Sequence, residues 1–313
     1  KKIKLANPRG FCAGVDRAID IVNRALEIYG PPVYVKHEVV HNKVVVNDLK
    51  QRGAIFVEDI NEIPDESLVI FSAHGVSSQV EETTRSRNLN YFDATCPLVT
   101  KVHMEVIKHA KANKDIILVG HQGHPEVEGT MGRHINSQNS SIYLVQDEQD
   151  AKNIEIANRT NLALVTQTTL SVDETKSIIE ILKNRFPNIN IPKKDDICYA
   201  TQNRQDAVKQ LALESDYMIV VGSKNSSNSN RLREIAERGG VDSYLIDSLE
   251  DLDHKWLEGR SVIGITSGAS APEHLVRELV ALLQDRYSCS LYGEKERADE
   301  GISFRLPKGL RST

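Results

Sequence analysis

The sequence predicts an α/β protein made of three small parallel-sheet domains arranged in a pseudo-threefold ring. The main observation is that the same order of elements occurs three times along the 313 residues, each time starting at a cysteine. The spacing supports the repeat. From Cys12, Cys96 and Cys198 to a first polar loop there are 29, 28 and 28 residues, and to a second polar loop 62, 72 and 72.

Each repeat begins with a helix directly after its cysteine. After Cys12 the apolar side chains of residues 14–29 recur on one helical face, and Gly30-Pro31-Pro32 ends the helix. After Cys96 comes Pro97, a residue favoured at the first helical position. A third amphipathic segment follows Cys198.

Three strands and a closing helix complete each repeat. The first strands are expected at 33–35, 116–119 and 218–221, and each leads into a polar loop. The second strands are expected at 54–57, 142–145 and 243–246. The third strands, 68–71, 162–165 and 262–265, lead into a second polar loop and then into helices 76–87, 171–186 and 272–286.

This reading divides the chain into domains at 1–95, 96–196 and 197–286, followed by a tail at 287–313. The alternating segment 302–307 of the tail is expected to add an edge strand. Alternating strands and helices of these lengths form parallel sheets, which bind ligands beyond the carboxyl ends of their strands. All six polar loops fall at those ends.

The three repeat cysteines occupy equivalent positions, and equivalent residues near a threefold axis converge. We therefore expect Cys12, Cys96 and Cys198 to meet at a common centre. The alternative is that each thiol is a small buried hydrophobe at a strand–helix junction, as lone cysteines usually are. Three matched positions favour convergence. Cys289 has no counterpart in the repeat and is expected to have no role in function.

Three thiolates without a fourth protein ligand suit two kinds of metal centre. One is zinc, usually completed by histidine. The other is a 4Fe–4S cluster with one iron open to substrate. A helix N-terminus behind each cysteine favours the thiolate in both cases. The residues alone leave the choice open.

The polar loops carry groups that bind phosphate. Neutral donors and histidines are both present, and the Ser-Asn run opens a helix whose N–H groups offer an anion site. Such loops can also be ordinary turns and caps. Six of them at one end of the sheets indicate a diphosphate site, with these candidates: His41, His74, His124, Ser226, Ser227, Asn228 and Ser270.

Glu126, in the run His124-Pro125-Glu126, is the carboxylate placed among these loops. Beside Thr168 and a metal centre it is a candidate proton donor. Glu128 is the alternative donor, and a loop-bracing role for Glu126 is the other reading.

Composition excludes several classes of protein. A net charge of −5 argues against broad nucleic-acid binding, which needs a basic surface. No apolar run approaches the ~20 residues that cross a bilayer, and the N-terminus lacks the apolar core of a signal peptide. Four widely spaced cysteines do not form a secreted disulfide framework, so a reducing cytoplasmic compartment fits best.

Eight segments in order resemble the LytB/IspH family of 4-hydroxy-3-methylbut-2-enyl diphosphate reductases. The resemblance runs over about residues 3–310 and rests on NPRGFCAGV (7–15), HEVVHN (37–42), SAHGV (72–76), DATCP (93–97), GHPEVEG (123–129), DICYAT (196–201), SSNSNR (226–231) and GASAP (268–272).

The resemblance implies a cloverleaf of three α/β domains around one 4Fe–4S cluster held by Cys12, Cys96 and Cys198. It implies that the seven loop residues named earlier form the diphosphate pocket. It also implies that Glu126 is the proton-relay acid and that Thr168 contacts the substrate near its hydroxyl. The implied reaction removes that hydroxyl reductively, with electrons from a flavodoxin or ferredoxin. A zinc-dependent phosphohydrolase and an iron–sulfur sensor remain as alternatives.

Overall fold

The computed structural model describes residues 1–313 apart from 135–138, 158, 294–295 and 312–313. The described chain separates into two compact units. Unit 1 comprises Lys1–Asp16, Val40–Asp48 and Tyr199–Ser303, and unit 2 comprises Arg17–Val39, Leu49–Cys198 and Phe304–Thr313. Three parallel sheets lie within these units, which confirms the predicted α/β class with three small parallel sheets.

Unit 1 contains a five-stranded sheet in the order β10-β9-β11-β1-β12. Every neighbouring pair is parallel. The strands are β1 (Lys2–Leu5), β9 (Tyr217–Val221), β10 (Asp242–Ile246), β11 (Val262–Ser267) and β12 (Ser290–Tyr292).

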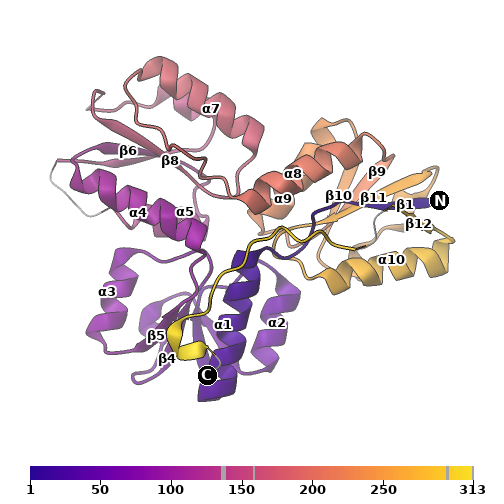
Figure 1. The fold of residues 1–313 in the computed structure, drawn as a ribbon, viewed down its shortest axis with the longest axis horizontal. Helices are drawn as coiled ribbons and strands as arrows, with labels where there is room; N and C mark the ends of the chain where they lie inside the picture. The colour runs from indigo at the N-terminus through magenta and orange to yellow at the C-terminus, as the bar shows by residue number, and fades with distance from the viewer. Residues whose placement is uncertain (135–138, 158, 294–295, 312–313) are drawn as a thin grey trace. The chain divides into compact units, whose positions relative to one another are not determined.

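Helices cover both faces of this sheet, which explains why the central strands read as continuous apolar runs. α10 (Glu273–Tyr287) packs on one face, where Ile219 and Ile265 join its buried side chains. α8 (Tyr199–Ala212) and α9 (Ser227–Arg238) pack on the other, against Met218 and Val220 (Figure 1).

Unit 2 contains the other two sheets, again with only parallel pairs. The four-stranded sheet has the order β3-β2-β4-β5 and the three-stranded sheet the order β7-β6-β8. Their strands are β2 (Val33–Lys36), β3 (Ala54–Val57), β4 (Leu68–Phe71), β5 (Asn90–Asp93), β6 (Asp115–Val119), β7 (Ile142–Val145) and β8 (Leu162–Thr166).

The helices of unit 2 pack against these two sheets. On the three-stranded sheet, α4 (Pro97–Lys111) and α5 (Pro125–Met131) share an apolar cluster with one face. α6 (Glu148–Asn153) and α7 (Val172–Arg185) share another with the opposite face. α3 (Ser78–Ser86) contributes Val80 to the core of the four-stranded sheet.

Two further helices begin in unit 1 and end in unit 2. They are α1 (Ala13–Tyr29) and α2 (Lys43–Gln51). The described helices are all too short or too polar to cross a membrane.

Three features of the strands differ from the prediction. β5 adds a fourth strand to the sheet of the first repeat, where only three were expected. β1 pairs with β11 and β12, so the N-terminus belongs to the sheet of the third repeat. The expected edge strand at 302–307 is wrong, since that segment forms no strand, and β12 supplies the edge instead. The predicted domain boundaries at 95, 196 and 286 stay predictions.

Candidate active site

The sequence-predicted site residues fall into two groups, one in each unit. All of them follow the carboxyl end of a parallel strand or open a helix. The unit 1 group is Cys12, His41, Ser226, Ser227, Asn228 and Ser270, and the unit 2 group is His74, Cys96, His124, Glu126, Thr168 and Cys198.

In the unit 1 group, hydrogen bonds join the loops after β9 and β11 to His41. The Oγ of Ser270 donates to the carbonyl oxygen of His41 at 2.9 Å and lies 3.5 Å from the Oγ of Ser226. The Nδ2 of Asn225 lies 3.4 Å from the Nδ1 of His41. His41, Ser226 and Ser270 are all buried, so their positions are set by packing.

The N-terminus of α9 lies at the centre of this group. Ser226 is the N-cap, and its Oγ accepts a hydrogen bond from the N–H of Ser229 at 3.3 Å. The buried Oδ1 of Asn228 accepts from the N–H of Ala269 at 2.8 Å, which ties the helix to the loop after β11. A helix N-terminus with serine hydroxyls beside it is a suitable anion site.

Cys12 lies against the same loop, because its N–H donates to the carbonyl oxygen of Ala269 at 3.2 Å. Burial raises the pKa of the Cys12 thiol, while a hydrogen bond from the Val15 backbone and the charge of Arg204 act in the opposite direction. A metal that binds the Cys12 thiolate therefore releases the thiol proton.

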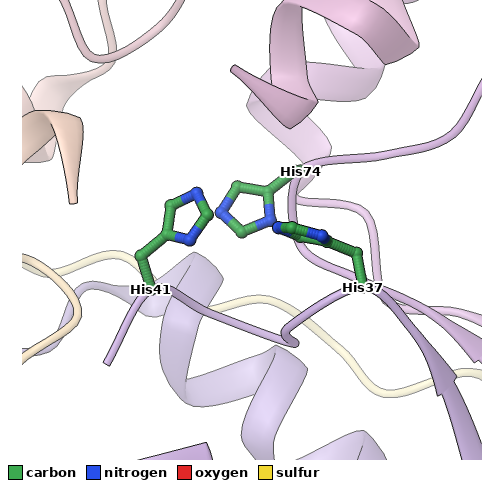
Figure 2. A group of neighbouring side chains, drawn as sticks. All are labelled: His37, His41 and His74. Carbon is green, nitrogen blue, oxygen red and sulfur yellow. The ribbon is translucent and has the colours of Figure 1, made fainter. Parts of the chain in front are cut away.

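In the unit 2 group, His74 lies between two other histidines. Its ring meets that of His37 edge-to-face at 5.7 Å between centroids, and that of His124 at 5.8 Å. Figure 2 shows the rings of His37 and His74 next to each other in unit 2. The loop carrying His74 also holds Cys96, whose N–H donates to the carbonyl oxygen of Ala73 at 3.0 Å.

His124, Glu126 and Thr168 form a connected hydrogen-bond network. The Nδ1 of His124 accepts from the N–H of Glu126 at 3.1 Å. The Glu126 carboxylate accepts from both the N–H of Thr168, at 2.6 Å, and its Oγ1, at 3.0 Å. The carbonyl oxygen of Thr168 in turn accepts from the N–H of Cys198 at 3.0 Å. The network therefore ends at a candidate metal ligand.

Burial raises the pKa of Glu126 to about 7, against the lowering effect of the two Thr168 hydrogen bonds, and nearby Asp196 raises it further. A carboxyl group with this pKa is partly protonated near neutral pH and can donate a proton. The competing candidate, Glu128, is exposed to solvent. Glu126 therefore fits the donor role better than Glu128 does.

All four cysteines lie in the described part of the chain, and none of them is in a disulfide. Cys12, Cys96 and Cys198 are half-buried and each directly precedes a helix, whereas Cys289 is buried in the apolar core of unit 1. Partly accessible thiols at helix N-termini are suitable metal ligands, so the donor set fits an iron–sulfur cluster.

The sequence reasoning missed two neighbours of the unit 2 group. His37 packs against His74 and lies 2.9 Å from the Glu58 carboxylate. Asp196 is buried, accepts from the N–H of Thr166 at 3.0 Å and raises the pKa of Glu126. Asp196 stands two residues before Cys198, but nothing local in the sequence shows that it faces Glu126.

Residues 3–284 match the LytB protein family. A curated relative from Ectopseudomonas mendocina (strain ymp) is 61% identical over 309 residues, covering 99% of this chain and 98% of the relative. One from Alcanivorax borkumensis is 59% identical over 314 residues, covering 99% of each chain. Both are named 4-hydroxy-3-methylbut-2-enyl diphosphate reductase.

Solved structures agree with the sequence matches. The E-1-hydroxy-2-methyl-but-2-enyl-4-diphosphate reductase from Plasmodium falciparum is 40% identical with a TM-score of 0.90, covering 99% of this chain and 96% of that one. A second structure is (E)-4-hydroxy-3-methyl-but-2-enyl diphosphate reductase, described as the terminal enzyme of the non-mevalonate pathway. It is 32% identical with a TM-score of 0.64, covering 91% of this chain and 99% of that one. This chain belongs to the LytB family.

Proposed function

We propose that this protein reduces (E)-4-hydroxy-3-methylbut-2-enyl diphosphate to isopentenyl and dimethylallyl diphosphates, consuming two electrons and two protons. Family membership over nearly the full chain supports the proposal. The single observation that carries the chemistry is the buried Glu126–Thr168 pair, which is hydrogen-bonded to the backbone of Cys198.

The cofactor of this proposal is one 4Fe–4S cluster with Cys12, Cys96 and Cys198 as ligands. When bound, it supplies electrons and a Lewis-acid iron for the substrate hydroxyl. The support comes from three half-buried thiols at equivalent places in the repeat.

The substrate diphosphate would bind to the seven loop residues predicted from the sequence. In unit 1 the N-terminus of α9 and its serines donate hydrogen bonds to the phosphate oxygens, and in unit 2 His74 and His124 add donors that carry charge when protonated. Fixing the diphosphate in this way orients the hydroxymethyl end of the substrate, which lowers the entropic cost of the reaction.

Glu126 would supply the proton that lets the hydroxyl leave as water. Thr168 holds both carboxylate oxygens through its N–H and its hydroxyl, and that hydroxyl can pass a proton onward. Burial keeps the Glu126 carboxyl protonated to a higher pH than an exposed glutamate. A substantial fraction of the carboxyl therefore carries the proton to be donated near neutral pH.

A flavodoxin or ferredoxin is the proposed electron donor, as the family resemblance implies, since these carriers deliver the single electrons that a 4Fe–4S cluster accepts. We further propose a cytoplasmic location, because thiols outside disulfides fit a reducing compartment. The alternatives of a zinc-dependent phosphohydrolase and an iron–sulfur sensor find no support among the named relatives.

Anaerobic purification followed by iron and sulfide analysis tests the cofactor. The allylic diphosphate is then supplied with a chemically reduced dye, and both products are measured by chromatography. A brown protein that bleaches on reduction and forms both products supports the proposal. A colourless, air-stable protein that contains zinc would refute it.

The variant Glu126→Gln tests the proton donor. It keeps the size of the side chain and one acceptor oxygen but removes the acidic proton. We expect unchanged iron content and substrate affinity, with turnover reduced by about 10²-fold or more. Turnover close to that of the unchanged protein would remove Glu126 from the proton path.

A further inference from the structure

Arg204, on α8, holds the loop that precedes Cys12. Its side chain is fully buried, and its Nη2 donates to the carbonyl oxygens of Gly10, at 2.7 Å, and Phe11, at 3.2 Å. Its Nε donates to Gly10 as well, at 3.0 Å. The charge is balanced by Glu300, whose carboxylate lies 3.0 Å from Nη2.

Lys101, on α4, has the same relation to the segment that precedes Cys198. Its Nζ donates to the carbonyl oxygens of Lys194, at 3.2 Å, and Asp195, at 3.4 Å. It also contacts the Asp196 carboxylate at 3.1 Å. The Lys101 side chain is 39% exposed, so solvent screens its charge more than that of Arg204.

Arg17, on α1, completes the series at the segment that precedes Cys96. Its two Nη atoms donate to the carbonyl oxygens of Thr95, at 3.1 Å, and Asp93, at 3.3 Å. Burial lowers the pKa of Arg17, while the negative charges of Asp93 and Cys96 raise it. The guanidinium is therefore close enough to the Cys96 sulfur for their charges to interact.

The three contacts follow one rule. Each cation lies five or six residues after one repeat cysteine and donates hydrogen bonds to backbone carbonyls just before another. Arg17 follows Cys12 and binds the segment before Cys96. Lys101 follows Cys96 and binds the segment before Cys198, and Arg204 follows Cys198 and binds the segment before Cys12. The order is cyclic, as a threefold repeat requires. We refer to Arg17, Lys101 and Arg204 as the loop cations.

We propose that the loop cations fix the backbone before each ligand cysteine and supply the positive charge that sets the reduction potential of the cofactor. This inference rests on the proposed function and assigns roles to three residues outside the ligand and substrate sets. A positive charge near the thiolates favours the more negative, reduced form of a cluster, which raises its potential. The hydrogen bonds to the carbonyls act separately, by holding the loop.

Ordinary stabilisation of loops is the competing explanation, since buried carbonyl groups need donors in any protein. Two observations argue against it as the whole account. The donors are cationic in all three repeats, although neutral side chains or backbone would satisfy a carbonyl equally well. The charges of Arg204 and Arg17 also interact with the sulfurs of Cys12 and Cys96.

Redox titration of the anaerobically purified protein tests the charge role. We expect Arg204→Gln and Arg17→Gln to lower the ratio of reduced to oxidised cluster, at a fixed applied potential, by about tenfold, which is a shift of about 59 mV for one electron. Lys101→Gln should change it less, because of its exposure. Glu300→Gln, which removes the balancing negative charge, should shift the potential in the opposite direction.

Arg24→Gln, Lys108→Gln and Lys209→Gln are the matched controls, since each removes one positive charge from the same helix further from its cysteine. Potentials of Arg204→Gln and Arg17→Gln equal to those of their controls would overturn the charge role. The charge role would also be overturned if Glu300→Gln shifted the reduction potential in the same direction as Arg204→Gln. Removing a negative and a positive charge should shift the potential in opposite directions, whereas disruption of the fold gives no reason for opposite shifts.

Amide hydrogen exchange in the cofactor-free protein tests the positioning role. The reporters are the N–H groups of Cys12, Cys96 and Cys198, which donate to Ala269, Ala73 and Thr168. We expect Arg204→Lys to speed exchange at Cys12 by about tenfold or more, because lysine keeps the charge but loses the forked donor geometry. Exchange at the other two cysteines should stay unchanged.

The same measurement on Arg17→Lys should report at Cys96 alone. The positioning role would be overturned if exchange stayed unchanged at the cysteine that follows the bound segment, or became faster at all three cysteines. The exchange experiment needs neither cofactor nor substrate. A protein that fails to form a cluster or to turn over the allylic diphosphate therefore refutes the proposed function. The hydrogen-exchange result would still test the positioning role.

Discussion

Gly75 decides where the His74 loop lies. Its φ is +80°, a conformation that side chains rarely adopt, and a Cβ built there would lie 2.5 Å from the Cε1 of His103. His103 cannot move away easily, because it is buried on α4. Burial and the charge of Arg133 lower the pKa of His103 to about 3, so the imidazole that supports the loop is neutral.

Gly75→Ala is expected to destabilise the protein by about 3 kcal/mol, because backbone strain and a steric clash both act there. Gly123→Ala is the control, since its φ of +79° gives the same strain while a Cβ there meets nothing within 4 Å. The control should lose only about 1 kcal/mol. Denaturant unfolding measures both, and equal losses would show that His103 does not restrict the loop.

Glu126 makes stability depend on pH. Its pKa is raised from 4.5 in the unfolded chain to about 7 in the folded protein, so the folded protein holds this proton more tightly. The resulting stabilisation is complete below pH 4.5 and is lost as the pH rises through about 7.

Glu126→Gln removes this contribution. The unfolding free energy of the cofactor-free protein, measured relative to Glu126→Gln, should therefore fall between pH 5 and 8 with a slope of up to about 1.4 kcal/mol per pH unit. Denaturant unfolding of both proteins across this range is the measurement. Parallel stability curves would mean that Glu126 titrates near its ordinary pKa.

At the scale of elements, the start of α9 combines a structural and a binding role. Ser226 caps the helix through its Oγ, and the same hydroxyl lies beside Ser270 at the predicted diphosphate site. Ser77 caps α3 with the same 3.3 Å bond to a backbone N–H but is not among the predicted diphosphate residues.

Ser226→Ala and Ser77→Ala should each lose about 1 kcal/mol of stability through the lost cap. Only Ser226→Ala is expected to bind inorganic diphosphate about tenfold more weakly, since a direct phosphate contact is lost there. Calorimetric titration of the cofactor-free protein with diphosphate distinguishes the two. Equal affinities would place the anion away from the start of α9.

At the scale of the whole molecule, the three proposed ligand cysteines are far apart in the chain, with Cys12 in unit 1 and Cys96 and Cys198 in unit 2. Cys289 differs from all three. It is 5% exposed and packs in the apolar core beside α10.

Changing Cys12, Cys96 or Cys198 singly to serine should remove most of the bound iron, since a hydroxyl is a poor ligand for an iron–sulfur cluster. Cys289→Ser should keep full iron content and lose about 1–2 kcal/mol of stability, because it buries a hydroxyl among apolar side chains. Iron analysis of the four variants is the measurement. Equal iron content in Cys198→Ser and Cys289→Ser would refute the ligand assignment.

The sequence by itself determined the features that leave a local signal. The threefold order of strands and helices, the polar loops at strand ends and the equivalent cysteines all follow from periodicity, breakers and spacing. The same short motifs sufficed to indicate the family, and the choice between zinc and iron came from that resemblance. The cysteine ligands alone did not distinguish zinc from an iron–sulfur cluster.

Only the tertiary structure decided how distant segments pair. Nothing local in residues 2–5 shows that they join a strand near residue 262, and the tail strand lies at 290–292, away from the alternating segment that predicted one. The pKa of Glu126 and the contact between Arg204 and Gly10, 194 residues apart, have the same origin. Burial and long-range hydrogen bonds depend on which surfaces pack together in the folded protein, and a short segment of sequence does not contain that information.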